Sequence, residues 1–280
     1  MDLKNVKPLK QEIIDEIKAD VLVVVDKYNL SLRSRVGEDI FEILKKEGFL
    51  IFHPFKDTRV WGVFISKSNE KYFVINSSLK LEEMIFAAAH EYAHSRKIAY
   101  RETEILTGRQ LNEYLNGSEE NGFTEEIERK ASRFAAELLV CEKRLKNYID
   151  GEFGGDELTL VHVLKLSEYF LVPYKTIIRR LYEENIISEK CFYDFAKIAK
   201  EELKFTMNRY ELCVKNNSIS KEKRYGEYTN ILLELYENNL RTYSELKEML
   251  ELLGSVPSDF GIEEETDIFD FMIRSFKNGE

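Results

Sequence analysis

Several features that mark special classes of protein are scarce in this chain of 280 residues. With 4 Pro and 13 Gly, it does not have the composition of a collagen-like or low-complexity chain. The longest strongly aliphatic run, Val21 to Val25, is far shorter than the roughly 20 residues that a bilayer span needs. Residues 1–10 also lack the apolar stretch of a signal peptide. We therefore expect a soluble cytoplasmic protein without a membrane partner.

Cysteine and positive charge are scarce as well. The three cysteines, Cys141, Cys191 and Cys213, are widely spaced and form no CxxC pair, which argues against a disulfide framework and against a thiolate zinc site. Lys and Arg number 41 against 51 Asp and Glu, for a net charge of −10. Such a charge repels nucleic acid at long range, so the composition argues against a nucleic-acid partner.

The chain has enough apolar residues, 44% of the total, to form a hydrophobic core. Residues 36–47 repeat apolar side chains at helical spacing, whereas 49–55, 60–66 and 71–76 are short runs rich in Phe, Ile, Val, Trp and Tyr. From Leu81 onward the pattern is helical again. These patterns predict an α+β fold, with a small antiparallel sheet early and helices late.

The helical part divides further at its polar breaks. We expect one long helix from Thr124 to about Arg144, then a helix-turn-helix-like pair within 158–184. A soft boundary near Ser188 separates a first domain, 1–187, from a helical C-terminal region, 188–280, to which the sequence assigns no role.

Within the helix that begins at Leu81, His90, Glu91 and His94 form the pattern HExxH. The four-residue spacing places the two imidazoles on one face, about 40° apart and one turn apart in height. Both can therefore reach one metal ion. Glu91 lies about 100° round the helix from His90, where it can accept a hydrogen bond from a water molecule held by that ion. This position suits a general base.

Catalytic zinc takes three protein ligands, and no third histidine follows at HExxHxxGxxH spacing, so the remaining candidates are carboxylates. Glu128 and Glu137 both lie on the predicted helix after Thr124. Ala131 and Ala135 continue the stripe that begins at Glu128, which would allow this helix to approach the first closely. That favours Glu128, with Glu137 as the competitor.

Two segments together resemble the ImmA/IrrE family of zinc metallopeptidases. The first is FxxAHExxH, which begins at Phe86, and the second is ExxAxxFAxELL over 128–139. The resemblance implies a zincin-like domain over about half of the chain. It also implies that His90, His94 and Glu128 hold Zn²⁺ and that Glu91 is the catalytic base.

The resemblance further implies a biological role. Members of this family are endopeptidases that cut a helix-turn-helix transcriptional repressor and so derepress genes of a mobile element or a stress response. We therefore expect a protein substrate of that kind; composition and spacing alone do not identify it.

Two other interpretations compete with this one. Residues 158–184 would bind DNA if Lys175, Arg179 and Arg180 formed a recognition helix, although nearby glutamates nearly balance their charge. Alternatively, the domain would be a peptidase-like regulator that binds a partner protein without cutting it. Glu91 favours an enzyme over such a module, because binding alone does not need a base beside the metal.

The group that stabilises the oxyanion is left open among His162, Tyr92 and Tyr100. Tyr92 lies about 200° round the helix from His90, so we expect it to face the core. His162 is flanked by Val161 and Val163, and we interpret it as a core histidine whose nitrogens have partners.

Overall fold

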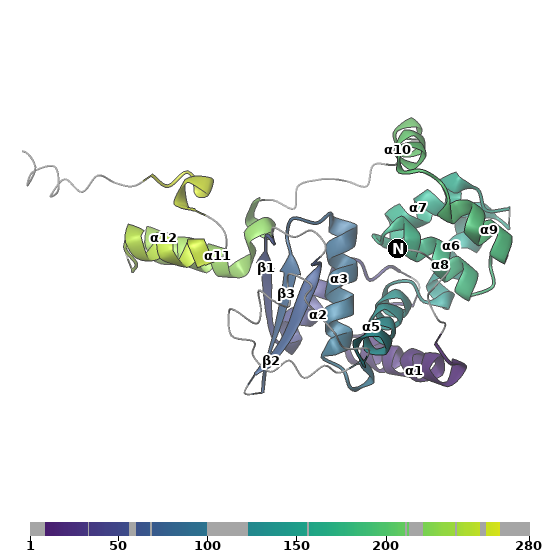
Figure 1. Cartoon of the computed structure of the whole chain (residues 1–280), viewed down its shortest axis with the longest axis horizontal. Helices are drawn as coiled ribbons and strands as arrows, with labels where there is room; N and C mark the ends of the chain where they lie inside the picture. Colours follow the sequence, from purple (N-terminus) through teal and green to yellow (C-terminus); the bar gives the residue numbers. More distant parts are fainter. Residues whose placement is uncertain are drawn as a thin grey trace, which may run out of the picture.

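The computed structural model describes residues 9–32, 34–55, 60–67, 69–99, 123–155, 157–210, 212, 221–238, 240–252 and 256–263. Over these residues the chain has the predicted α+β fold, with a small sheet followed by helices (Figure 1). The elements in the first half of the chain are, in order, α1 (Gln11–Lys27), α2 (Asp39–Glu47), β1 (Phe49–His53), β2 (Gly62–Lys67), β3 (Glu70–Asn76), α3 (Leu81–His94), the 3₁₀ helix η1 (Lys97–Ala99) and α5 (Phe123–Leu139).

The sheet has the strand order β1-β3-β2. β2 and β3 form an antiparallel hairpin in which Lys67 pairs with Glu70. β1 runs parallel to β3, with Leu50 opposite Phe73, so the prediction of an antiparallel sheet is wrong for this strand. That prediction treated consecutive strands as neighbours. The chain instead places β3 in the centre, where Phe73 and Ile75 are fully buried, and leaves β1 and β2 as the edges.

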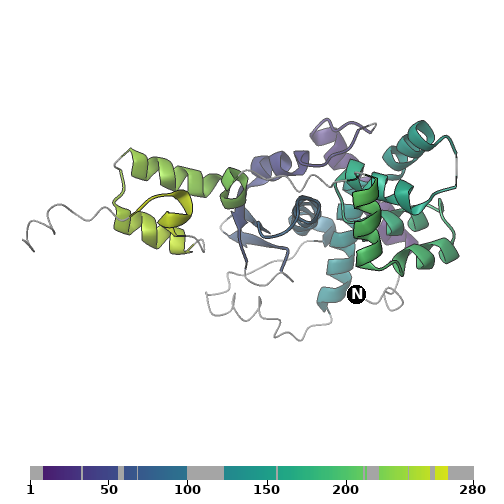
Figure 2. The same cartoon turned by 90° about the horizontal axis from the view of Figure 1, so that it is seen from above.

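α3 lies between the sheet and α5 (Figures 1 and 2). It contacts β2 and β3 on one side and α5 on the other, while α2 packs against both α3 and β1. A helix that is covered on two sides must be apolar around most of its surface. The run Ala87 to Ala89 meets this demand, and these three alanines are at most 2% exposed.

The predicted long helix is interrupted. α5 ends at Leu139, and α6 (Glu142–Phe153) begins after an extended Cys141. The carbonyl groups at the break have side-chain partners: Arg144 donates a hydrogen bond to the carbonyl of Leu138, and Arg180 donates one to the carbonyl of Val140. Buried arginines thus satisfy the groups that a continuing helix would have satisfied, so the prediction of one helix to Arg144 is wrong.

The remaining elements are α7 (Leu160–Phe170), α8 (Tyr174–Glu183), α9 (Glu189–Ala196), α10 (Lys200–Arg209), α11 (Lys221–Glu237), α12 (Tyr243–Leu252) and the 3₁₀ helix η2 (Pro257–Phe260). The described residues form two hydrophobic clusters. The main core extends from α1 to Phe192, in α9. A second cluster is formed by Leu232, Leu246 and Leu250, where α11 packs against α12. α11 also lies beside β1, at the sheet edge opposite β2 (Figure 1).

The boundary between 187 and 188 therefore stays a prediction. The main core continues past it into α9, and the second cluster lies in α11 and α12. Among the described residues, no helix combines the length and the apolar character that crossing a bilayer requires.

A buried network of ion pairs joins α5 to α8. Arg180 is fully buried, and its guanidinium lies 3.0 Å from Glu137, 2.9 Å from Glu183 and 2.7 Å from Glu184. Arg133, from α5, contacts Glu137 at 3.1 Å and also pairs with Glu183. Burial raises the pKa of Glu137 to about 7, against the opposing charge of Arg133. Because these charges are shielded from water, removal of one leaves the others uncompensated.

We expect Arg180→Ala to lower the free energy of unfolding by about 3–5 kcal/mol, as measured by urea titration, because it leaves buried carboxylates without a partner. Arg179→Ala is the matched control on the same helix. Its side chain is 40% exposed and pairs with Glu183, so Arg179→Ala should lower the free energy of unfolding by less than about 1 kcal/mol. Equal losses for the two variants would contradict the buried network.

Candidate metal centre

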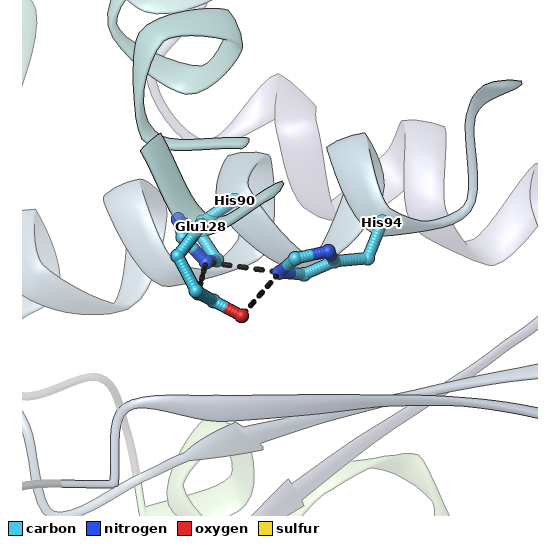
Figure 3. A group of neighbouring side chains, drawn as sticks. All are labelled: His90, His94 and Glu128. Carbon is cyan, nitrogen blue, oxygen red and sulfur yellow. Dashed lines mark hydrogen bonds and ion pairs between the residues drawn. The ribbon is translucent and has the colours of Figure 1, made fainter. Parts of the chain in front are cut away.

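The two histidines of the HExxH pattern face the same point in space. His90 and His94 lie one turn apart on α3, and their Nε2 atoms are 3.1 Å apart (Figure 3). His94 is 4% exposed, and the side chain of His90 is 16% exposed. The structure therefore brings the two predicted histidines together on one largely buried face of α3.

A carboxylate from α5 completes the group. Glu128 Oε2 lies 3.0 Å from His90 Nε2, and Glu128 Oε1 lies 3.5 Å from His94 Nε2. Figure 3 shows the three side chains pointing toward one another from two helices. Within the described residues, this is the group of His, Cys, Asp and Glu side chains that could hold a metal ion, with all ligand atoms within 4.8 Å of one another.

The donor atoms have the spacing that a small cation requires. A tetrahedral zinc ion with ligands at about 2.0–2.1 Å places two ligand atoms about 3.3 Å apart. The separations between His90 Nε2, His94 Nε2 and Glu128 are 3.0, 3.1 and 3.5 Å. Two imidazoles and one carboxylate are also the donor types that zinc binds at catalytic sites. These residues therefore fit a zinc ion.

Electrostatics point in the same direction. Burial alone would lower the pKa of His94, but the hydrogen bond with Glu128 and the charges of Glu91 and Glu128 outweigh burial and raise that pKa. The pKa of Glu128 is well below its usual range, because hydrogen bonds and charge from His90 and His94 outweigh the cost of burial. The group thus attracts positive charge, whether a proton or a metal ion.

Second partners orient both imidazoles. The carbonyl of Ala99, in η1, lies 3.1 Å from His94 Nδ1 and can accept a hydrogen bond from it. The hydroxyl of Ser132, one turn beyond Glu128 on α5, lies 3.3 Å from His90 Nδ1. With Nδ1 of each ring held in this way, Nε2 is left to face the metal position.

Glu91 is buried, and its side chain lies against strand β2. It is 7% exposed, and its carboxylate accepts a hydrogen bond from the backbone amide of Phe64, in β2. Burial raises the pKa of Glu91, and nearby Glu128 adds to that effect, while charge on His90 and His94 opposes it. A carboxyl group with a raised pKa is better able to accept and return a proton near neutral pH.

Comparison with known proteins agrees with this geometry. Residues 45–182 match the model of the Peptidase_M78 family, described as the IrrE N-terminal-like domain. This part of the chain belongs to that family. The match includes His90, Glu91, His94 and Glu128, and the family is one of metallopeptidases.

A phage protein is similar to part of this chain. "Uncharacterized immunity region protein 2" of Bacillus phage phi105 is 27% identical over 117 residues, which are 39% of this chain and 68% of the phage protein. The similarity connects this chain with a phage protein whose name refers to an immunity region.

Two other candidates from the sequence have partners outside the group of His90, His94 and Glu128. Glu137, the competing third ligand, is bound to Arg133 and Arg180. His162 caps the start of α7 at Thr159 and stacks on Phe153, with ring centroids 4.4 Å apart; it is partly exposed rather than a core residue. Tyr100 lies outside the described residues.

Tyr92 faces the core, as predicted, and it has partners that the sequence did not reveal. Its hydroxyl donates to Glu47 at 3.1 Å, and Glu47 also accepts from Tyr28 and Lys27. Arg96 donates to the Tyr92 hydroxyl at 3.2 Å. A buried tyrosine hydroxyl usually has a hydrogen-bond partner, but neither the motif nor its spacing indicates Glu47. This network holds the face of α3 opposite His90 and His94.

We expect Glu128→Ala to lower the affinity for zinc by at least about 100-fold, because two imidazoles alone leave the ion with too few protein ligands. Zinc content after dialysis against a weak chelator measures this loss. Glu126→Ala is the control, because Glu126 lies on the same helix and pairs with Lys130. Zinc retention by the Glu128 variant equal to that of the wild type would contradict the ligand assignment.

The Glu47 network predicts a dependence of stability on pH. Burial alone would raise the pKa of Glu47, but hydrogen bonds from Lys27, Tyr28 and Tyr92 outweigh burial and lower it from 4.5 to about 2. The contribution of Glu47 to stability is therefore complete above pH 4.5 and is lost as the pH falls toward 2.

The difference in unfolding free energy between wild type and Glu47→Gln should shrink by about 2 kcal/mol between pH 7 and pH 3. Urea titrations at both pH values measure it. Glu42→Gln is the control, because Glu42 is an exposed position on the same helix and pairs with Lys45 instead. A difference for Glu47→Gln that does not vary with pH would contradict the assigned network.

Proposed function

We propose that this protein is a zinc-dependent endopeptidase. The observation that carries the proposal is the convergence of His90, His94 and Glu128 on one point, with the buried carboxyl of Glu91 on the same helix. Zinc is the metal that this set of nitrogen and oxygen donors favours, since magnesium and calcium prefer oxygen ligands throughout.

Zinc, when bound, would polarise the scissile carbonyl and lower the pKa of water toward ~7. His90, His94 and Glu128 would hold the ion. Glu91 would accept the proton of the attacking water and later return it to the leaving amine. The hydrogen bond from the amide of Phe64 would keep the Glu91 carboxylate in one position between these two proton transfers.

The proposed substrate is a regulatory protein, specifically a helix-turn-helix transcriptional repressor whose cleavage derepresses genes of a mobile element or a stress response. Membership of residues 45–182 in the IrrE N-terminal-like family supports this choice. The similarity to a phage protein named for an immunity region supports a regulatory context.

The DNA-binding alternative receives little support from α8. Arg180 was one of three basic residues proposed to read DNA, but it is fully buried and held by Glu137, Glu183 and Glu184. Arg179 pairs with Glu183. Phosphate contacts need exposed positive charge, and α8 offers less of it than its sequence suggested. A peptidase-like regulator that binds without cutting is the other alternative, and the buried base at position 91 argues against it.

The decisive experiment compares wild type with Glu91→Gln on a purified helix-turn-helix repressor encoded beside the gene. Both proteins should bind one zinc, but only wild type should cleave at an appreciable rate, with kcat for Glu91→Gln lower by about 10²–10⁴-fold. Removal of zinc with a chelator should abolish cleavage by the wild type.

Equal cleavage by wild type and Glu91→Gln would overturn the mechanism. A zinc-loaded wild type that leaves the repressor intact but cuts unfolded casein would contradict only the proposed substrate. Zinc-loaded wild type that cuts neither protein would favour the non-cleaving regulator.

A further inference from the structure

Strand β2 has a glycine, Gly62, at the point where it lies against Glu91, the proposed base. A Cβ atom added at Gly62 would lie 2.8 Å from Glu91 Cγ and 3.2 Å from Glu91 Oε1. It would also lie 3.1 Å from the carbonyl oxygen of Val74. The first of these distances is shorter than any ordinary carbon–carbon contact, so even alanine would require Glu91 or the strand to move.

The backbone itself gives no reason for glycine at this position. Gly62 is not among the residues with positive φ, and it pairs with Ile75 in the regular antiparallel register of β2 and β3. Glycine weakens a strand where nothing else requires it. The close approach of Glu91 supplies the requirement, because a buried glutamate fills the space that a side chain at position 62 would occupy.

The same strand also supplies a hydrogen bond. The backbone amide of Phe64, two residues along β2 from Gly62, donates to the Glu91 carboxylate. Glu91 therefore meets a hydrogen-bond donor at one position of β2 and the space left by a missing side chain at another.

We propose that Gly62 is a positioning residue for Glu91, and that its missing side chain sets the place of the carboxylate beside the metal ligands. The inference rests on the proposed function, because Gly62 affects cleavage only if Glu91 is the catalytic base. Transition-state geometry tolerates little displacement, and a shift of about 1 Å in a catalytic group can cost about 100-fold in rate. Alanine at position 62 forces a shift of that order.

The test is a double-mutant cycle with two readouts. Gly62→Ala is made in the wild type and in Glu91→Ala, and the midpoint of thermal unfolding is measured on the metal-free proteins. We expect Gly62→Ala to lower the midpoint by about 3–8 °C in the wild type, from overpacking. The loss should be less than half as large in Glu91→Ala, because two of the three atoms nearest to the added Cβ belong to the Glu91 side chain beyond its Cβ.

The second readout uses the zinc-loaded proteins and the repressor substrate. Gly62→Ala should lower kcat by about 10–100-fold. KM and zinc content should stay near wild-type values, because the added Cβ meets Glu91 and Val74 rather than the proposed zinc ligands. Gly151→Ala is the control, because a Cβ there meets nothing within 4 Å. It should leave kcat unchanged, and it should raise rather than lower the thermal midpoint, because alanine replaces glycine inside helix α6.

An equal thermal loss in both backgrounds would overturn the inference, since it would place the clash elsewhere than Glu91. Full cleavage by Gly62→Ala would overturn it as well, while the proposed function would stand. If wild type cleaves no substrate, the proposed function fails, and the thermal cycle on metal-free protein still decides whether Gly62 sets the place of Glu91.

Discussion

The close packing of α3 against α5 is the constraint on which the site depends. Two of its members come from α3 and the third from α5, so the distance between the helices decides whether Glu128 reaches the imidazoles. Ala88 and Ala89 on one helix and Ala131 and Ala135 on the other are all fully buried. Small residues allow two helices to approach near the lower limit of about 8 Å between their axes. Larger side chains at these positions would carry Glu128 away from His90 and His94.

The two glutamates of the site differ in the environment that each helix gives them. Glu91 is buried against β2, which raises its pKa, while Glu128 faces two imidazoles, which lower its pKa. A carboxyl group that readily changes protonation suits a base, and one that stays ionised suits a metal ligand. Strand β2 therefore shapes the surroundings of the Glu91 carboxyl group, through the amide of Phe64 and the space at Gly62.

The grouping of the three side chains could be predicted because the information for it is local. HExxH spacing fixes two imidazoles on one helical face, and the second motif indicated Glu128 as their partner; the structure brings the three together, and their role as metal ligands stays a prediction. Non-local features were not predictable. The parallel alignment of β1 depends on which strand takes the centre of the sheet, and the break after α5 depends on Arg180, which is 40 residues away from its acceptor Val140. Glu47 and Gly62 likewise acquire their partners only through tertiary packing.

Zinc binding by His90, His94 and Glu128 can be tested by X-ray diffraction at the zinc absorption edge, on crystals of the wild type loaded with one equivalent of zinc. We expect a single anomalous peak within about 2.0–2.2 Å of His90 Nε2, His94 Nε2 and a carboxylate oxygen of Glu128. A peak at other residues, or no peak in protein that has been given zinc, would contradict it.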